Sequence, residues 1–348
     1  MNRHNNFDLL RLLAASGVMA LHVRMLSASP SLDFLAVLGP RLSLSTFFVI
    51  SGFLVYMSSE RSGSLADYAG KRLRRVMPAY VVTVLACTLL GCLLSTLPPQ
   101  AYFGADSARY LLANLSFLNF LKPDLPGVFV GNPYPGAPVN GALWTIKVEL
   151  MFYVLVPWLV RLVKRFGHHR VLGACFLFGC AWWCGFMYLA AITGKAAFAE
   201  LAKQMPGQLM YFMPGAWCYC ERDRLKRMAW RLPLIGVALL LCASQWGRHS
   251  LVPDALLHPI GLAACVFWIA YGLPYVKVTR YGDLSYGIYI WHFPVIQTLV
   301  QLGLYSAAPM PALLATLCVV LALAWCSWRY IEAPMLGAHG VSRPVAVA

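Results

Sequence analysis

The chain has 348 residues, of which 60% are hydrophobic and only 12% are charged, and its mean hydropathy is +0.65. A soluble globular domain carries about 25% charged residues, so this composition excludes a soluble protein and predicts a polytopic membrane protein. The formal net charge of +15 does not indicate a nucleic-acid partner, because the basic residues follow the alternation of the membrane connections.

Ten apolar segments have roughly the length of a membrane span, about 20 residues. The sixth and seventh are the weakest of them, and little sequence is left for a soluble domain. We therefore predict an all-α helix bundle in which residues 1–335 form one membrane domain and residues 336–348 form a short cytoplasmic tail. The ten segments are 8–28, 42–59, 78–97, 142–160, 171–193, 205–219, 232–247, 255–275, 284–304 and 311–331.

Lysine and arginine are distributed unevenly between alternate connections. If the N-terminus is cytoplasmic, 19 of these residues fall on the inner side and seven on the outer side. Cytoplasmic loops carry an excess of basic residues, so this asymmetry predicts ten spans with both termini in the cytoplasm.

The 11 cysteines lie nearly all within the apolar segments. Their spacing matches neither a zinc site nor a disulfide framework. We interpret them as small buried hydrophobic residues and expect no metal.

The first apolar segment, FDLLRLLAASGVMALHV, contains Arg11 and His22. Eleven residues at about 100° each end roughly 20° past three full turns, so both side chains share one helix face, about 16 Å apart. Ala15 and Val18 lie between them and are small enough to leave that face open. Ionisable residues at membrane depth are costly and are usually functional. The alternative is an arginine that reaches the membrane surface and a histidine with a structural partner.

The fourth segment contains Glu149 within ALWTIKVELMFY. Counted along their helices, Glu149 and His22 both lie about 10 Å below the outer surface. A carboxylate beside an imidazole fixes its tautomer and makes it a better general base. The alternative is a structural pair between Glu149 and a basic residue.

A dense basic cluster, Lys71, Arg72, Arg74 and Arg75, precedes Pro78. Arg72 and Arg75 are three residues apart and share a helix face, where two guanidinium groups can bind phosphate oxygens. Coenzyme A would provide such phosphates, whereas contact with anionic lipids is the alternative. Pro78 suits a first helical turn, so we expect the third helix to begin at this cluster.

Three further features carry weaker signals. Ser51 and Gly52 fall in the middle of the second segment, where glycine permits close helix packing. His292 falls near mid-membrane, and Glu332 at the end of the last segment is expected to serve as an anchor or a salt-bridge partner. The longest connection, about residues 98–141, is rich in turn residues and is expected to be an outer binding loop or an ordinary surface connection.

Together these elements resemble the acyltransferase 3 family of integral membrane acyltransferases. The resemblance covers nearly the whole chain and follows the family's order, from FDLLR and the Arg-x10-His pair through FFVISGFLV, KRLRRVMPAY, LWTIKVELMFY and LSYGIYIWHFPV to YIEAP. It implies a bundle of about ten spans that transfers an acyl group, often acetyl, from acetyl-coenzyme A or another acyl-coenzyme A to an acceptor hydroxyl. The acceptors are commonly extracytoplasmic polysaccharides.

The resemblance also implies roles for individual residues. His22 matches the family's essential histidine, Arg11 its paired basic residue, and Arg72 and Arg75 its cytoplasmic basic motif. Many relatives carry an additional C-terminal esterase-like domain, which we do not expect in this protein. We therefore expect either that the membrane domain suffices or that a separate extracytoplasmic transferase completes the reaction.

The predicted protein is an O-acyltransferase of the inner membrane, in contact with membrane lipids. Coenzyme A would dock from the cytoplasm against Arg72, Arg75 and Lys71, and also toward Arg11, which we assign to the catalytic group with His22 and Glu149. His22 would act as general base on the hydroxyl of a polysaccharide or lipid-linked sugar, or would carry the acyl group covalently, and Glu149 would orient it.

Two alternatives remain open at this point. One is a proton-coupled transporter or a carrier of a lipid-linked sugar, with His22, Glu149 and His292 as a proton relay. The other is an acyltransferase that acts on a small-molecule acceptor.

Overall fold

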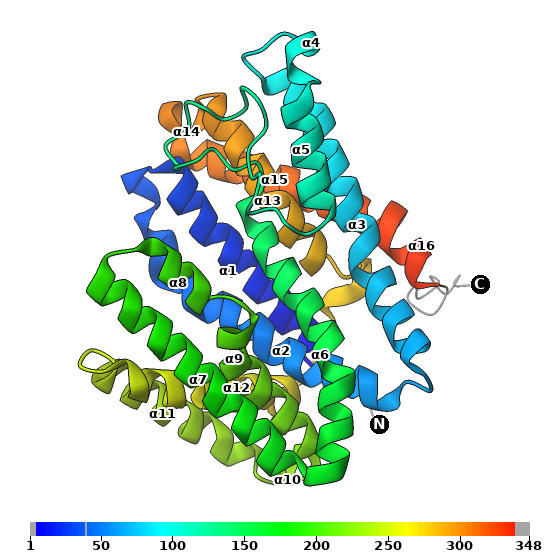
Figure 1. Cartoon of the computed structure of the whole chain (residues 1–348), viewed down its shortest axis with the longest axis vertical. Helices are drawn as coiled ribbons and strands as arrows, with labels where there is room; N and C mark the ends of the chain where they lie inside the picture. Colours follow the sequence, from blue (N-terminus) through cyan, green and yellow to red (C-terminus); the bar gives the residue numbers. More distant parts are fainter. Residues whose placement is uncertain (1–4, 39, 338–348) are drawn as a thin grey trace. The chain divides into compact units, whose positions relative to one another are not determined.

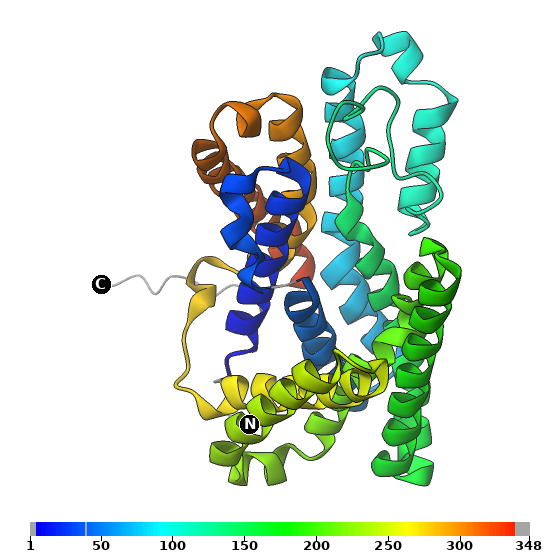
Figure 2. The same ribbon diagram turned by 90° about the vertical axis from the view of Figure 1, so that its left-hand side faces the viewer.

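The computed structural model describes residues 5–38 and 40–337, and within these ranges the protein is all-α, without β-strands (Figures 1 and 2). Residues 338–348 of the predicted tail lie outside the described ranges. The long helices are α1 (Phe7–Ser27), α2 (Pro40–Arg61), α3 (Leu65–Leu94), α6 (Trp144–Phe166), α7 (His168–Thr193), α9 (Met205–Cys220), α11 (Leu232–Trp246), α12 (Leu251–Gly272), α13 (Ser285–Gln301) and α15 (Pro309–Ser327).

Shorter helices lie between the long helices or follow the last of them. They are η1 (Pro30–Leu38), α4 (Pro99–Tyr102), α5 (Ala105–Leu115), η2 (Gly141–Leu143), α8 (Ala196–Ala202), α10 (Arg222–Arg227), η3 (Ala229–Arg231), η4 (Val278–Tyr281), α14 (Leu304–Ala307), η5 (Trp328–Glu332) and α16 (Ala333–Leu336). Two of them, α4 and α5, lie within the long connection that the sequence marks as rich in turns.

Each predicted apolar segment contains one long helix, which confirms an all-α polytopic membrane bundle. Among the described helices, seven are long and apolar enough to cross a membrane. The other three long helices are α6, which carries several charged residues, and α9 and α13, which have 16 and 17 residues. At 1.5 Å per residue, helices of that length extend only about 24–26 Å, less than the ~30 Å hydrocarbon core. The number of ten spans and the cytoplasmic position of both termini stay predictions.

The predicted start of the third helix is wrong. The helix α3 begins at Leu65 rather than near Pro78, which lies inside it. The Ser64 hydroxyl accepts a hydrogen bond from the Asp67 backbone N–H at 3.1 Å, and Asp67 places a carboxylate in the first turn. Serine caps and acidic first turns stabilise helix starts, and they outweigh the signal from an internal proline.

The described chain divides into two compact units that interleave along the sequence. The first unit comprises Met1–Ala14, Arg41–Tyr68 and Val148–Lys277, and the second unit comprises Ala15–Pro40, Ala69–Lys147 and Val278–Ala348. In the first unit, α7 packs on α9, α9 on α12, and α12 on α11. In the second unit, α13 packs on α15.

Two glycines allow close packing of α2 against α9 in the first unit. A Cβ atom at Gly52 would collide with the carbonyl oxygen of Phe212, and one at Gly215 would collide with that of Val49. The backbones therefore approach as small residues permit between membrane helices. This contact confirms the packing role expected of Gly52.

In the second unit, α5 lies alongside the C-terminal half of α3 (cyan in Figures 1 and 2). The Tyr80 hydroxyl donates a hydrogen bond to the Asn114 carbonyl oxygen at 2.7 Å, and its ring stacks on Phe117 with the centroids 4.5 Å apart. The start of the long connection is thus fixed to a buried part of α3.

We expect Gly52→Ala to destabilise the protein, because the added methyl group meets backbone rather than a movable side chain. Overpacking costs about 1–3 kcal/mol, which would lower the thermal midpoint of the purified protein measurably. Gly185→Ala is the matched control, since apart from the neighbouring backbone of α7 no atom of the described residues lies within 4 Å of the added Cβ. Equal thermal midpoints for the two variants would contradict the close packing of α2 and α9.

Candidate active site

His22 faces a second histidine within the second unit. Its Nδ1 atom lies 2.8 Å from Nε2 of His292, and the two rings are nearly parallel, with centroids 5.0 Å apart. His292 is fully buried, whereas His22 is partly exposed. The Nδ1 atom of His292 lies 3.0 Å from the carbonyl oxygen of Ile288, one turn earlier in α13.

The sequence did not predict the pairing of His22 with His292. Counting residues gave each histidine a depth, but depth does not say which helices are neighbours. The sequence contains one indication of this pairing. His22 and His292 are both ionisable residues inside apolar segments, and such residues usually pair with another polar group of the protein.

The end of the long connection packs close to this histidine pair. The Phe293 ring meets the His22 ring edge-on, with centroids 5.1 Å apart. Gly141 also lies against Phe293, since a Cβ atom there would come within 2.7 Å of the ring. Glycine is therefore required at this position for the close approach of the connection to Phe293.

Amide side chains attach the long connection to α13. The Asn140 side chain donates to the Ile290 carbonyl oxygen at 2.8 Å. The Gln297 side chain donates to the Pro138 carbonyl oxygen at 3.0 Å and accepts from the Asn132 amide at 2.8 Å. Asn140 and Gln297 are both buried, so these bonds form away from water and hold the connection in one place.

A further amide, Gln301, continues this attachment. Its oxygen accepts from the Phe129 backbone N–H at 3.0 Å, and its nitrogen donates to the Leu94 carbonyl oxygen at 2.6 Å. Phe117, Phe129 and Ala137 in the same connection have positive φ angles of 60°, 60° and 42°. Such backbone strain persists where surrounding contacts enforce it and is concentrated at functional sites. The connection is therefore a built part of the second unit, which favours the binding-loop interpretation.

The other two predicted catalytic residues belong to the first unit. Glu149 accepts a hydrogen bond from the hydroxyl of Tyr153, one turn later in α6. Arg11 forms an ion pair with Asp8, one turn earlier in α1. The pairing of Glu149 with His22 stays a prediction.

The predicted donor-binding residue Arg75 has partners inside the second unit. Its guanidinium lies 2.5 Å from Asp283 and 3.6 Å from Glu332. Glu332 is 2% exposed, lies in the π-helical turn η5, and also accepts from the Ser327 hydroxyl at 2.9 Å. The expected role of Glu332 as a salt-bridge partner is confirmed. Arg75 is thus an internal cation, and the donor-binding role of Lys71, Arg72 and Arg75 stays a prediction.

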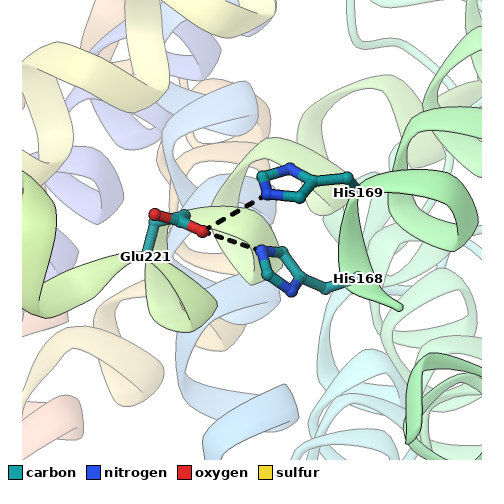
Figure 3. Close-up of side chains that lie close together, drawn as sticks. All are labelled: His168, His169 and Glu221. Atoms are coloured by element: carbon teal, nitrogen blue, oxygen red, sulfur yellow. Dashed lines mark hydrogen bonds and ion pairs between the residues drawn. The ribbon is translucent and has the colours of Figure 1, made fainter.

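A separate polar cluster in the first unit joins the start of α7 to the end of α9 (Figure 3). His168 Nε2 and His169 Nε2 lie 2.8 and 3.5 Å from the same Glu221 oxygen. The Trp217 indole N–H donates to His169 Nδ1 at 3.2 Å, so neutral His169 carries its proton on Nε2, toward Glu221. A metal ligand at Nε2 would instead need a proton on Nδ1, opposite the indole N–H. The geometry therefore fits a hydrogen-bonded joint between helices.

The family model of acyltransferase 3, described as an acyltransferase domain, matches residues 4–329. The chain belongs to the acyltransferase 3 family. An O-acetyl transferase of Shigella phage Sf6 is 26% identical over 95% of this chain and 96% of the relative. Nodulation protein 10 of Rhizobium leguminosarum bv. viciae is 29% identical over 95% of this chain and 93% of the relative.

A further relative is O-acetyltransferase OatA of Staphylococcus aureus, which is 24% identical over 94% of this chain and 56% of its own length. Comparison with solved structures gives no significant match. The chain is therefore an O-acetyltransferase of the multi-pass membrane type, and its reaction requires an acyl donor.

We expect Arg75→Gln to reduce stability, because it removes the cation that lies between Asp283 and the buried Glu332. Removing one partner of a buried ion pair costs about 3–5 kcal/mol. The triple variant Arg75→Gln, Asp283→Asn, Glu332→Gln also neutralises both carboxylates and should recover most of the loss in a thermal unfolding assay. If Arg75→Gln keeps normal stability and only loses coenzyme A affinity, the internal network is not its main role.

Proposed function

We propose that this enzyme moves an acetyl group from cytoplasmic acetyl-coenzyme A to a hydroxyl of an extracytoplasmic polysaccharide or lipid-linked sugar at the inner membrane. The observation that carries the proposal is the His22–His292 pair, a partly exposed imidazole held by a fully buried one inside apolar helices. Such an arrangement suits a general base rather than a packing residue. Two relatives whose names state O-acetyl transfer support the choice of acetyl.

In the proposed reaction, His22 takes the proton of the acceptor hydroxyl as the oxygen attacks the carbonyl carbon of the thioester. The carbon–sulfur bond then breaks, and the resulting imidazolium of His22 returns the proton to the departing thiolate. The products are the ester and free coenzyme A. Glu149 balances the positive charge that forms on His22, and Arg11 extends the same helix face toward the donor.

The donor would be bound on the cytoplasmic side by the basic face of α3. Arg72 and Lys71 would contact the phosphates, and Arg75, held by Asp283 and Glu332, would keep that face in register. One guanidinium group can bind two phosphate oxygens at once, whereas a lysine ammonium acts as a point charge. Arg72 would therefore make the main contact.

The transporter alternative finds less support in the second unit. A proton relay needs an acceptor at each step, but His292 Nδ1 ends on the carbonyl oxygen of Ile288, which does not pass a proton on. A small-molecule acceptor is a second acceptor class that the same chemistry would serve.

We expect His22→Ala to reduce acetyl transfer by at least 100-fold, within the usual contribution of a general base. Transfer is measured in membranes with acetyl-coenzyme A and in cells by mass spectrometry of surface glycans, with protein abundance quantified in the same samples. His249→Ala is the control, since His249 is exposed near the end of α11. Normal transfer by His22→Ala would remove the catalytic assignment.

The proposed orientation can be tested by cysteine labelling. Ala108 in α5 is exposed, whereas the neighbouring Ser107 is 3% exposed and unsuitable as a labelling site. On a background without the exposed Cys318 and Cys326, an impermeant maleimide should label Ala108→Cys in intact cells and Arg224→Cys only after lysis. The positive-inside distribution gives this direction, and the reverse pattern would invert the proposed mechanism.

A further inference from the structure

We propose that His292 is a positioning residue that fixes the tautomer of His22, so that Nε2 of His22 is the atom that accepts the substrate proton. This inference rests on the proposed role of His22 as general base. It adds to that role the identity of the reacting nitrogen and the residue that selects it.

The argument begins at the carbonyl oxygen of Ile288. A carbonyl oxygen can only accept a hydrogen bond, so His292 Nδ1, 3.0 Å away, must carry a hydrogen atom. His292 is 0% exposed, and its ring lies near those of His22, Tyr289 and Phe293. A charged imidazole is costly in such surroundings, so His292 is neutral and its Nε2 atom carries a lone pair.

That lone pair decides the tautomer of His22. His22 Nδ1 lies 2.8 Å from His292 Nε2, a distance at which two lone pairs would repel each other. His22 Nδ1 must therefore carry the hydrogen atom and donate it to His292. Neutral His22 then has its lone pair on Nε2, on a side chain that remains partly exposed.

The same bond strengthens when the reaction proceeds. Once Nε2 of His22 takes the substrate proton, the positive charge spreads over the ring, and the Nδ1–H donor becomes charged. Hydrogen bonds from charged donors are about twice as strong as neutral ones. His292 thus favours the protonated base formed during transfer as well as the correct tautomer before it.

The position of His292 is itself fixed by its neighbours in α13. The Ile290 carbonyl oxygen accepts a hydrogen bond from Asn140, and the Phe293 ring lies close to both His22 and Gly141. These contacts limit rotation of α13 and keep Nε2 of His292 directed at His22. A base that is held in one tautomer and orientation does not need to reorganise before each turnover.

Two replacements of His292 separate a positioning role from a merely structural one. His292→Gln can place its side-chain oxygen near the position of Nε2 and so retain an acceptor for His22. His292→Phe retains the ring volume but offers no acceptor. We expect His292→Phe to lower kcat for acetyl transfer by 10-fold to 100-fold with little change in KM for the donor, and His292→Gln to recover most of the kcat.

The control is Thr298→Val, also in α13, because among the described residues the Thr298 hydroxyl bonds only to the Pro294 carbonyl oxygen of its own helix, at 2.8 Å. It should keep normal kcat. If His292→Phe and His292→Gln lose activity equally and in proportion to thermal stability, His292 is structural and the inference is wrong.

Nitrogen-15 NMR of the histidine-labelled wild-type enzyme tests the tautomer without any substitution at His292. The signals that His22→Ala removes should show a protonated Nδ1 and an unprotonated Nε2, and the opposite assignment would overturn the inference. Retained transfer in His22→Ala would defeat the proposed function itself. Lost transfer in His22→Ala together with full kcat in His292→Phe would defeat only the role of His292.

Discussion

The structure depends on one constraint, which is that polar groups inside apolar helices must find partners within the protein, because lipid offers none. His22 and His292 satisfy each other, and Arg75 is satisfied by Asp283 and Glu332. In the first unit, Arg41 is similarly paired with Asp254 and donates to the Tyr211 hydroxyl at 2.7 Å. Each of these pairs joins segments far apart in the sequence, so the polar residues specify which helices become neighbours.

Much of the fold could be predicted because the hydrophobic pattern of each membrane helix is local. Every predicted apolar segment contains a long helix, and the family resemblance rests on motifs that are read directly in order. The start of α3 was misjudged because a proline can be tolerated inside a helix when a serine cap such as Ser64 supplies the true start. The sequence therefore contains two competing signals for the start of this helix, the cap at Ser64 and the proline at Pro78, and the cap marks the true start.

The candidate site could be predicted only in part. Sequence spacing identified His22 and Arg11 on one helix, but it could not identify the partner of His22. Residue counting gives only the depth of a side chain in the membrane, and many side chains on different helices share the same depth. Residue counting places Glu149 at the depth of His22 and His292 near mid-membrane, whereas the packing of α1 beside α13 within the second unit brings His292 into contact with His22. The tautomer follows from an atomic detail, the Ile288 carbonyl, which no residue pattern encodes.

The amide contacts between the long connection and α13 have a consequence for the evolution of acceptor choice. Asn140 of the connection bonds to α13, and Gln297 of α13 bonds to the connection. Because His292 also lies in α13, a movement of the connection would move His292. Exchanging the whole connection as an independent module would therefore also disturb the position of His292 and the alignment of the proposed base. We therefore expect a functional chimera to need the connection and α13 from the same parent, with changes tolerated in the exposed stretches between the anchored positions.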